Sequence, residues 1–146
     1  MRVVIQRVSR ADVVVEGQCL GSIETGLLVL AGFADADGDE QLRWMANKIA
    51  GLRVFEDDEE KMNLSVGDVG GSILLVPNFT LYADCQKGRR PGFSGAAAPD
   101  IATDLFDRFV DMVKESGVCV RKGQFGAHMV VSLSNDGPVT LIIDSP

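Results

Sequence analysis

Short runs of β-branched and aliphatic residues recur along the chain, and each run is bounded by glycine or by polar residues. Runs of this length and composition are typical of β-strands. Two polar segments with glycine, Glu16–Gln18 and Glu24–Gly26, separate neighbouring runs, so we expect turns between adjacent strands there. The strands predicted in this way are residues 3–5, 13–15, 27–30, 72–76, 129–133 and 139–143.

Two longer segments place their apolar residues with helical periodicity. The first runs from Gly38 to Gly51, and its closing glycine suits the end of a helix. The second runs from Pro99 to Gly117, where proline suits a first turn and glycine an end. Two helices among strands with mostly short links indicate an α+β domain. The apolar positions that share a face are Leu42, Met45, Ala46 and Ile49 in the first segment and Leu105, Phe109, Met112 and Val113 in the second.

Length and composition fit one globular domain over residues 1–146. Apolar residues make up 46% of the chain and charged residues 24%, which excludes disordered and fibrous classes. The longest apolar run, Gly26 to Phe33, is too short to cross a bilayer, so no membrane partner is expected. The three cysteines, Cys19, Cys85 and Cys119, are scattered and show no CxxC spacing, which favours reduced thiols in a cytoplasmic protein.

The chain is acidic overall, with a formal net charge of −7 at pH 7. A broad nucleic-acid-binding face is therefore not expected, and neither is DNA as a partner. One basic cluster, formed by Lys87, Arg89 and Arg90, stands out, and Arg121 with Lys122 makes a weaker one. Two interpretations are open: the charges are solvated loop residues, or they are a local docking point for the backbone of a polyanion.

Conventional catalytic and metal motifs are absent from the sequence. His128 is the only histidine, and it lies just before an apolar run, a position more typical of a strand-edge residue than of a base. Cys85 lies near Asp84 and Lys87, but no spacing motif supports an activated thiol. One histidine with dispersed cysteines makes a poor zinc set, and the acidic segment Glu56–Glu60 lacks the pattern of a Ca²⁺ loop. No phosphate-binding glycine motif is present either, so no metal or cofactor is expected.

The segment Asn78-Phe79-Thr80 offers polar groups where the predicted strand at residues 72–76 ends. Thr80 has two interpretations. It is a β-favouring residue within a strand, or its hydroxyl orients substrate or water while free backbone amides at Phe79 and Thr80 hold an oxyanion. No adjacent base is evident that would turn Thr80 into a nucleophile.

The segment Asn135-Asp136-Gly137-Pro138 separates the last two predicted strands and is rich in turn-forming residues, so it predicts a hairpin turn. Proline fixes φ and lacks an amide, and glycine lets another group approach the main chain closely. The pair therefore forms a rigid corner with few side-chain atoms. Such a corner can recognise the shape of a ligand with its carbonyl oxygens.

Taken together and in this order, segments along nearly the whole chain resemble the D-aminoacyl-tRNA deacylase family, also known as the D-tyrosyl-tRNA deacylase family. Each segment alone is a weak signal, whereas the ordered set is specific. The matching segments are Met1–Val8, Gly26–Val29, Lys48–Phe55, Phe79–Leu81, Lys87–Ala97 and Asn135–Thr140.

The resemblance implies a compact, mostly antiparallel β-barrel-like domain with two flanking helices, active as a homodimer. In the family the Gly-Pro bond is cis and the pair enters the partner's pocket. Gly137 and Pro138 would then form a chirality gate, with Arg7 as its support. The remaining residues implied are Asn78, Phe79 and Thr80 as the catalytic segment beside the scissile ester, Phe125, Gly126 and Met129 near the terminal adenosine, and Lys87, Arg89 and Arg90 on the tRNA.

The activity implied is hydrolysis of the ester that joins a D-amino acid to the 3′ end of tRNA. This ester is already activated, so positioning and oxyanion stabilisation are the main requirements. In the family the terminal 2′-OH assists the attack by water. An L side chain would meet the carbonyl oxygens of Gly137 and Pro138, whereas a D side chain would not. A filter that works by exclusion cannot reject glycine, so hydrolysis of glycyl-tRNA is expected as well.

One departure from the family pattern keeps alternatives open. The family signature usually reads Ser-Gln-Phe-Thr, whereas here it is Pro77-Asn78-Phe79-Thr80. A related branch that removes L-alanine from mischarged tRNA also has proline in the first position, so an L-alanyl-tRNA deacylase is one alternative. A non-catalytic dimeric RNA-binding module is the second, because Asn78 reaches less far than glutamine. A covalent hydrolase that uses Cys85 or Thr80 is the third.

Overall fold

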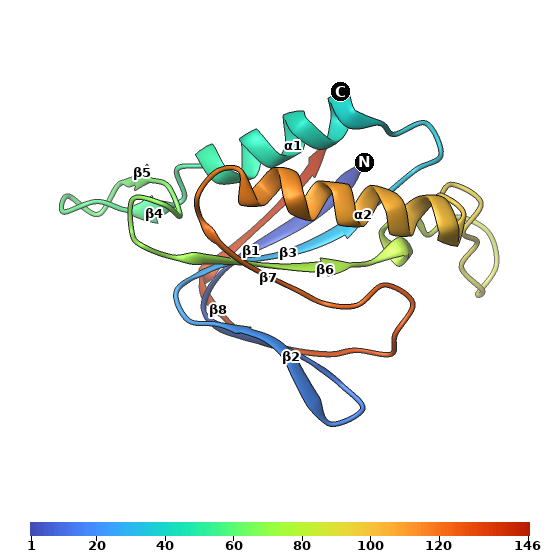
Figure 1. The fold of residues 1–146 in the computed structure, drawn as a ribbon, viewed down its shortest axis with the longest axis horizontal. Coiled ribbons are helices and arrows are strands. Elements are labelled where there is room, and N and C mark those ends of the chain that lie inside the picture. Colours follow the sequence, from blue (N-terminus) through green and yellow to red (C-terminus); the bar gives the residue numbers. More distant parts are fainter.

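The computed structural model describes all residues 1–146 and consists of a six-stranded mixed sheet with two helices (Figure 1). The helices α1 and α2 lie side by side over one face of the sheet, and the β2 hairpin curls away from them. A small two-stranded sheet, β4–β5, projects at one end. The elements in chain order are β1 Arg2–Val15, β2 Gln18–Ile23, β3 Gly26–Gly32, α1 Asp39–Gly51, β4 Phe55–Glu56, β5 Met62–Leu64, β6 Ser72–Pro77, the 3₁₀ helix η1 Phe79–Tyr82, α2 Pro99–Lys114, β7 Cys119–Lys122 and β8 Val130–Asp144.

The sheet closes almost into a barrel. β1 pairs in antiparallel orientation with β2, β3 and β8, whereas β3 pairs with β6 and β6 with β7 in parallel. β2 and β7 end the strand order, yet a Cβ atom added to Gly21 would lie 3.0 Å from Cβ of Arg121. The predicted α+β, barrel-like and mostly antiparallel fold is confirmed, with two parallel pairings in addition.

Two long strands replace four short predicted ones. Residues 3–5 and 13–15 both belong to β1, and residues 130–133 and 139–143 both belong to β8. β8 pairs with β1 on both sides of the Gly137-Pro138 pair, since Asn135 lies opposite Val8 and Thr140 lies opposite Gln6. The predicted hairpin turn at this pair is therefore wrong: residues 136–139 form a bulge in one continuous strand.

The bulge is closed by a side chain rather than by the strand ladder. The side-chain amide of Asn135 donates to the carbonyl oxygen of Val139 at 3.2 Å, and its oxygen accepts from the Val139 amide at 2.8 Å. These bonds satisfy backbone groups that lose their partners in β1. The sequence thus correctly indicated an irregular backbone at this segment. It did not indicate that the chain continues in the same direction after Pro138.

The main core lies between the sheet and the helices. Both helices turn their predicted apolar faces toward it, with the exception that Met112 is only partly buried. Edge-to-face contacts of Phe33 with Phe106 and Phe109, at 6.4 and 6.2 Å between ring centroids, join sheet and helix. A second, smaller core lies on the opposite face of the sheet, where the curled ends of β1 and β2 cover Leu28, Leu74 and Val76. Neither helix is long and apolar enough to span a membrane.

Candidate active site

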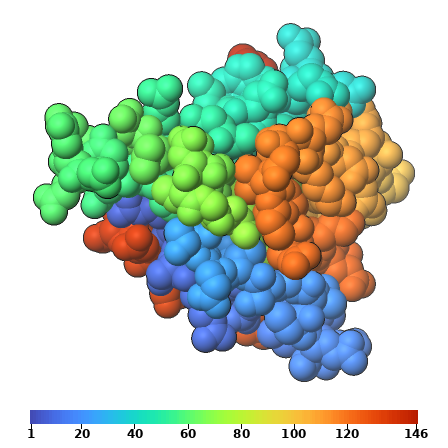
Figure 2. Space-filling model, turned by 60° about the vertical axis from the view of Figure 1, so that its left-hand side comes forward, coloured from blue at the N-terminus to red at the C-terminus, as the bar shows by residue number.

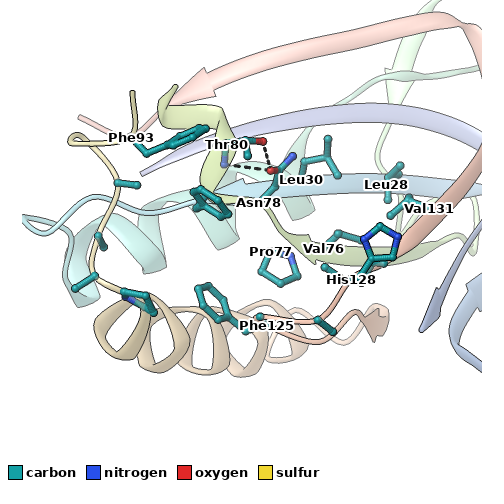
Figure 3. A pocket seen from close by; sticks show the side chains of 18 of the residues that line it. Leu28, Leu30, Val76, Pro77, Asn78, Thr80, Phe93, Phe125, His128 and Val131 are labelled. Atoms are coloured by element: carbon teal, nitrogen blue, oxygen red, sulfur yellow. Dashed lines mark hydrogen bonds between the residues drawn. The ribbon is translucent and has the colours of Figure 1, made fainter. Parts of the chain in front are cut away.

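A cavity of about 900 Å³ opens on the face of the sheet that the helices leave free. Its floor is formed by Leu28, Leu30 and Val76, and its walls by η1, by the loop that precedes α2 and by the segment between β7 and β8 (Figure 3). The lining is mainly apolar and contains no aspartate or glutamate. A cavity with few polar groups holds a ligand chiefly by shape and desolvation, and its polar groups orient the ligand.

The short helix η1 brings the predicted catalytic segment to the rim of this cavity. Asn78 is the single residue between β6 and η1, and its backbone amide donates to the carbonyl oxygen of Ala31 at 2.7 Å. The side-chain oxygen of Asn78 then accepts hydrogen bonds from the Thr80 amide at 3.2 Å and from the Thr80 hydroxyl at 2.5 Å. Asn78 is thus the N-cap of η1.

This capping corrects one expectation about the backbone donors. The Thr80 amide is not free, because the side chain of Asn78 occupies it. The amide of Phe79 is the first of η1, so it has no partner within the helix. Only Phe79 therefore presents a free backbone donor at this point, and a two-amide oxyanion hole at Phe79 and Thr80 is not formed.

Aromatic side chains line the mouth of the cavity. The rings of Phe79 and Phe93 meet edge to face, with centroids 5.1 Å apart. They are 50% and 37% exposed, so a ligand at the mouth would cover apolar surface that is now in contact with solvent. Phe125 lies on the other side of the opening (Figure 3). Phe93 belongs to the segment that carried the resemblance, but sequence reasoning gave it no role.

The segment between β7 and β8 supplies the other predicted residues. Phe125, Gly126 and Met129 all line the cavity. A Cβ atom on Gly123 would lie 2.7 Å from Sδ of Met129, so this glycine leaves room for the Met129 side chain within the segment. His128 lines the cavity too, among apolar neighbours that include Val76 and Val131 (Figure 3). No group of three or more histidine, cysteine, aspartate or glutamate side chains is placed to hold a metal ion.

The corner formed by Gly137 and Pro138 lies elsewhere. The corner is exposed, its peptide bond is cis, and Gly137 has a φ of 145°. Neither residue lines the cavity of its own protomer. A Cβ atom on Gly137 would lie 2.7 Å from the amide nitrogen of Val139, so the bulge has no room for a larger residue here.

Arg7 holds this corner from beneath. The residue is 6% exposed, its Nε donates to the carbonyl oxygen of Asp136 at 2.8 Å, and its Nη1 donates to the carbonyl oxygen of Val54 at 2.7 Å. The carboxylates of Glu56 and Asp136 each lie 3.7 Å from the guanidinium group. Arg7 thus ties the bulge of β8 to the β4–β5 hairpin, and Figure 2 shows these two segments side by side at one end of the molecule.

The basic cluster lies on a loop beside the cavity. Asp84 and Gly92 exchange two backbone hydrogen bonds of 2.8 and 2.9 Å, which close the loop that carries Lys87, Arg89 and Arg90. None of these three side chains forms an ion pair within the protein. Their charges are therefore available to an anionic ligand that reaches the rim.

A network that sequence reasoning missed supports η1 from behind. Arg2 donates to the Leu81 carbonyl oxygen at 3.4 Å, lies over the ring of Tyr82 at 5.8 Å, and binds both carboxylate oxygens of Asp144 at 2.7 and 3.1 Å. The hydrogen bonds from Arg2 hold the pKa of Asp144 below its ordinary value. Burial is the main cause that raises the pKa of Tyr82 to about 12.

Comparison with known proteins bears directly on these features. The family model described as D-Tyr-tRNA(Tyr) deacylase matches residues 4–144. The chain belongs to this family. It is 52% identical over 145 residues to a D-aminoacyl-tRNA deacylase of Thermotoga petrophila, with 99% of this chain and 97% of the relative covered. It is 56% identical over 144 residues to one of Exiguobacterium sibiricum, with 99% of both chains covered.

Two solved structures have a fold similar to that of this chain. This chain is 38% identical to a solved structure named c-Myc DNA Unwinding Element Binding Protein, with a TM-score of 0.93. The match covers 100% of this chain and 99% of that one. A second structure, described as a probable eukaryotic D-amino acid tRNA deacylase, is 23% identical with a TM-score of 0.83, and 97% of each chain is covered. The second likeness concerns the fold alone.

Proposed function

We propose that this protein hydrolyses the ester bond of D-aminoacyl-tRNA and releases the free D-amino acid and the tRNA. Family membership over nearly the full length carries this proposal. The cavity supports it, because Asn78, Phe79, Thr80, Phe125, Gly126 and Met129 converge there although they come from separate parts of the chain. A cavity whose lining contains no carboxylate suits an activated ester, which needs positioning more than a strong base.

In the proposed reaction the aminoacyl ester lies beside η1, and Phe125 packs against the terminal base. Water attacks the carbonyl carbon, and the free Phe79 amide donates a hydrogen bond to the oxyanion that forms. The bond from the carbonyl carbon to the ribose oxygen then breaks, and that oxygen takes up a proton. The terminal 2′-OH of the tRNA assists the deprotonation of water, so no side-chain base is required.

The active form is a homodimer in this proposal. β8 supports it because it pairs only with β1 and leaves one long edge free. The same strand carries Val130, Leu133 and Ile142, which are 56%, 38% and 69% exposed although they are large and apolar. A long free edge with apolar side chains is typical of a surface that pairs with another chain. In the dimer, Gly137 and Pro138 of one protomer enter the partner's cavity as the chirality gate.

The gate selects by exclusion. Its carbonyl oxygens stand where an L side chain would point, so L-aminoacyl esters are rejected and many D-amino acids are accepted. Glycine has no side chain to exclude, and glycyl-tRNA is therefore a further substrate.

Lys87, Arg89 and Arg90 bind the phosphates of the tRNA near its 3′ end. Duplex DNA competes poorly in this proposal, because the net charge of −7 repels a long polyanion. The cytoplasm is the proposed location.

The test of the activity is a parallel deacylation assay with D-tyrosyl-, L-tyrosyl-, glycyl- and L-alanyl-tRNA. Rapid loss of the D-tyrosyl and glycyl esters, with the L-tyrosyl ester stable, is the expected result. Preferential cleavage of L-alanyl-tRNA would instead establish the L-alanine-removing type. Binding of tRNA without turnover of any ester would establish the non-catalytic module. Alkylation of Cys85 is expected to leave turnover unchanged.

The test of the shared site uses mixed dimers of two variants. Gly137→Ala damages the corner, whereas Ala127→Trp obstructs the cavity that Ala127 lines. If the corner serves the partner, a mixed dimer contains one site with an intact cavity and an intact corner. Chiral selectivity should then return on mixing. If each corner served its own protomer, no mixed dimer would contain a complete site, and selectivity would stay lost.

A further inference from the structure

The cap of η1 determines where the proton of the Thr80 hydroxyl lies. The Thr80 amide can only donate, so the atom of Asn78 that lies 3.2 Å away must be the side-chain oxygen. The same oxygen lies 2.5 Å from the hydroxyl oxygen of Thr80. A side-chain amide oxygen has two lone pairs and no hydrogen, so the hydroxyl must be the donor of this second bond.

With its proton directed at Asn78, the Thr80 hydroxyl presents only lone pairs to other partners. Thr80 lines the cavity, and Figure 3 shows both hydrogen bonds to Asn78 at the cavity wall. We infer that Asn78 is a positioning residue that fixes the Thr80 hydroxyl as a hydrogen-bond acceptor toward the cavity. The inference rests on the proposed function and assigns a division of labour within it: Phe79 donates and Thr80 accepts.

The group that this acceptor binds is the attacking water. The α-ammonium group of the substrate is the other available donor, but it is a charged group. The cavity lining contains no carboxylate to pair with it, and a neutral hydroxyl in an apolar cavity does not compensate the loss of hydration. A water molecule is neutral, and an acceptor that holds one of its hydrogens turns a lone pair toward the ester.

The device is specific to the residue at position 78. Asparagine is among the strongest N-cap residues because its short side chain reaches the amide two residues ahead. Glutamine, whose side chain is one methylene longer, is not a preferred N-cap residue.

The test is a double-mutant cycle on kcat and KM for D-tyrosyl-tRNA. Asn78→Ala and Thr80→Val should each lower kcat about tenfold with little change in KM, because each removes the oriented acceptor. The double variant should be no slower than either single variant, since Asn78 acts through Thr80. Thr80→Ser keeps the hydroxyl and should retain nearly native kcat.

Loss of the cap alone also destabilises the protein, so two further variants separate stability from positioning. Asn78→Ser keeps a cap for the Thr80 amide but not the fixed hydroxyl proton. It should show a nearly native Tm with the reduced kcat. Ser116→Ala is the control, because Ser116 bonds to the Val113 carbonyl at the end of α2 at 2.7 Å, away from the cavity. It should lower Tm without changing kcat.

Three results would overturn the inference. They are a native kcat in Asn78→Ser, a double variant whose loss is the product of the two single losses, and an effect on KM rather than kcat. The last result would assign Thr80 to the ammonium group. A native protein that hydrolyses no D-aminoacyl-tRNA would refute the proposed function itself. Normal native turnover with unaffected variants would refute only the role of Asn78.

Discussion

The cavity and the Gly137-Pro138 corner differ in how completely one protomer builds them. The cavity has its floor, its aromatic mouth and its capped helix within a single chain. The corner is held by hydrogen bonds to the buried Arg7 and to Asn135. It is nevertheless exposed to solvent and does not line the cavity of its own protomer. In the proposed homodimer this corner would act in the cavity of the partner. If the two regions are independent, a mutation should damage one of them and leave the other intact.

Removal of Arg7 should break the corner and leave the cavity intact. Arg7→Ala leaves the carbonyl oxygens of Asp136 and Val54 without their buried partner, so we expect a loss of about 3 kcal/mol in unfolding free energy. Selectivity against L-tyrosyl-tRNA should fall with it. The measurement is urea unfolding together with the D-to-L rate ratio. Arg10→Ala on the same strand is the control and should cost about 0.5 kcal/mol or less, because Arg10 is exposed. Equal losses in both variants would contradict a supporting role for Arg7.

A methyl group on Gly137 should distort the corner without removing any partner. Gly137→Ala places a Cβ atom against the backbone of Val139 at a φ of 145°, which we expect to cost about 2 kcal/mol. The D-to-L rate ratio should fall while kcat for glycyl-tRNA stays near native, since glycine needs no filter. Gly51→Ala is the control, because nothing lies within 4 Å of its added Cβ atom. An unchanged D-to-L ratio in a folded Gly137→Ala protein would argue against the gate.

Neutralising the basic loop should weaken tRNA binding and leave both regions intact. Arg89→Gln with Arg90→Gln should raise KM several-fold and lower the slope of log affinity against log salt by roughly 1–2. The measurement is KM at three salt concentrations. Arg43→Gln is the control. It removes one positive charge from α1, where Arg43 pairs with Glu115, and should leave KM unchanged. If Arg43→Gln raised KM as much per charge, the effect would belong to net charge and not to the loop.

The Arg2–Asp144 pair behind η1 should make a small, pH-dependent contribution. The hydrogen bonds from Arg2 lower the pKa of Asp144 in the folded protein. A lowered folded pKa stabilises the protein above the unfolded value of about 3.9 and ceases to do so as pH falls through the folded pKa. Asp144→Asn should therefore lower the unfolding midpoint slightly at pH 7 and converge with the native protein in strong acid. A difference that grows with acid would contradict the pairing.

Sequence patterns correctly predicted the helices and two of the turns, whose formation depends on residues close together in the chain. Both helices begin where Gly38 and Pro99 indicated, and their apolar faces pack on the sheet as their periodicity predicted. The turns at Glu16–Gln18 and Glu24–Gly26 formed as expected, because turn propensity resides in a few adjacent residues. The resemblance supplied the family and named six residues that converge on one cavity.

Contacts between distant residues decided the rest. That residues 136–139 bulge rather than turn back depends on Thr140 and Asn135 finding partners in the same strand, more than 120 positions away in sequence. The hydrogen bond from the Thr80 amide to Asn78 depends on the 3₁₀ helix η1. The sequence of this segment does not predict that helix. Gln6 lines the cavity whereas its neighbour Arg7 does not, because successive residues of a strand point to opposite faces of the sheet. Amino-acid sequence determines local propensity and chemical identity directly, whereas the position of groups relative to one another is decided only when the sheet is assembled.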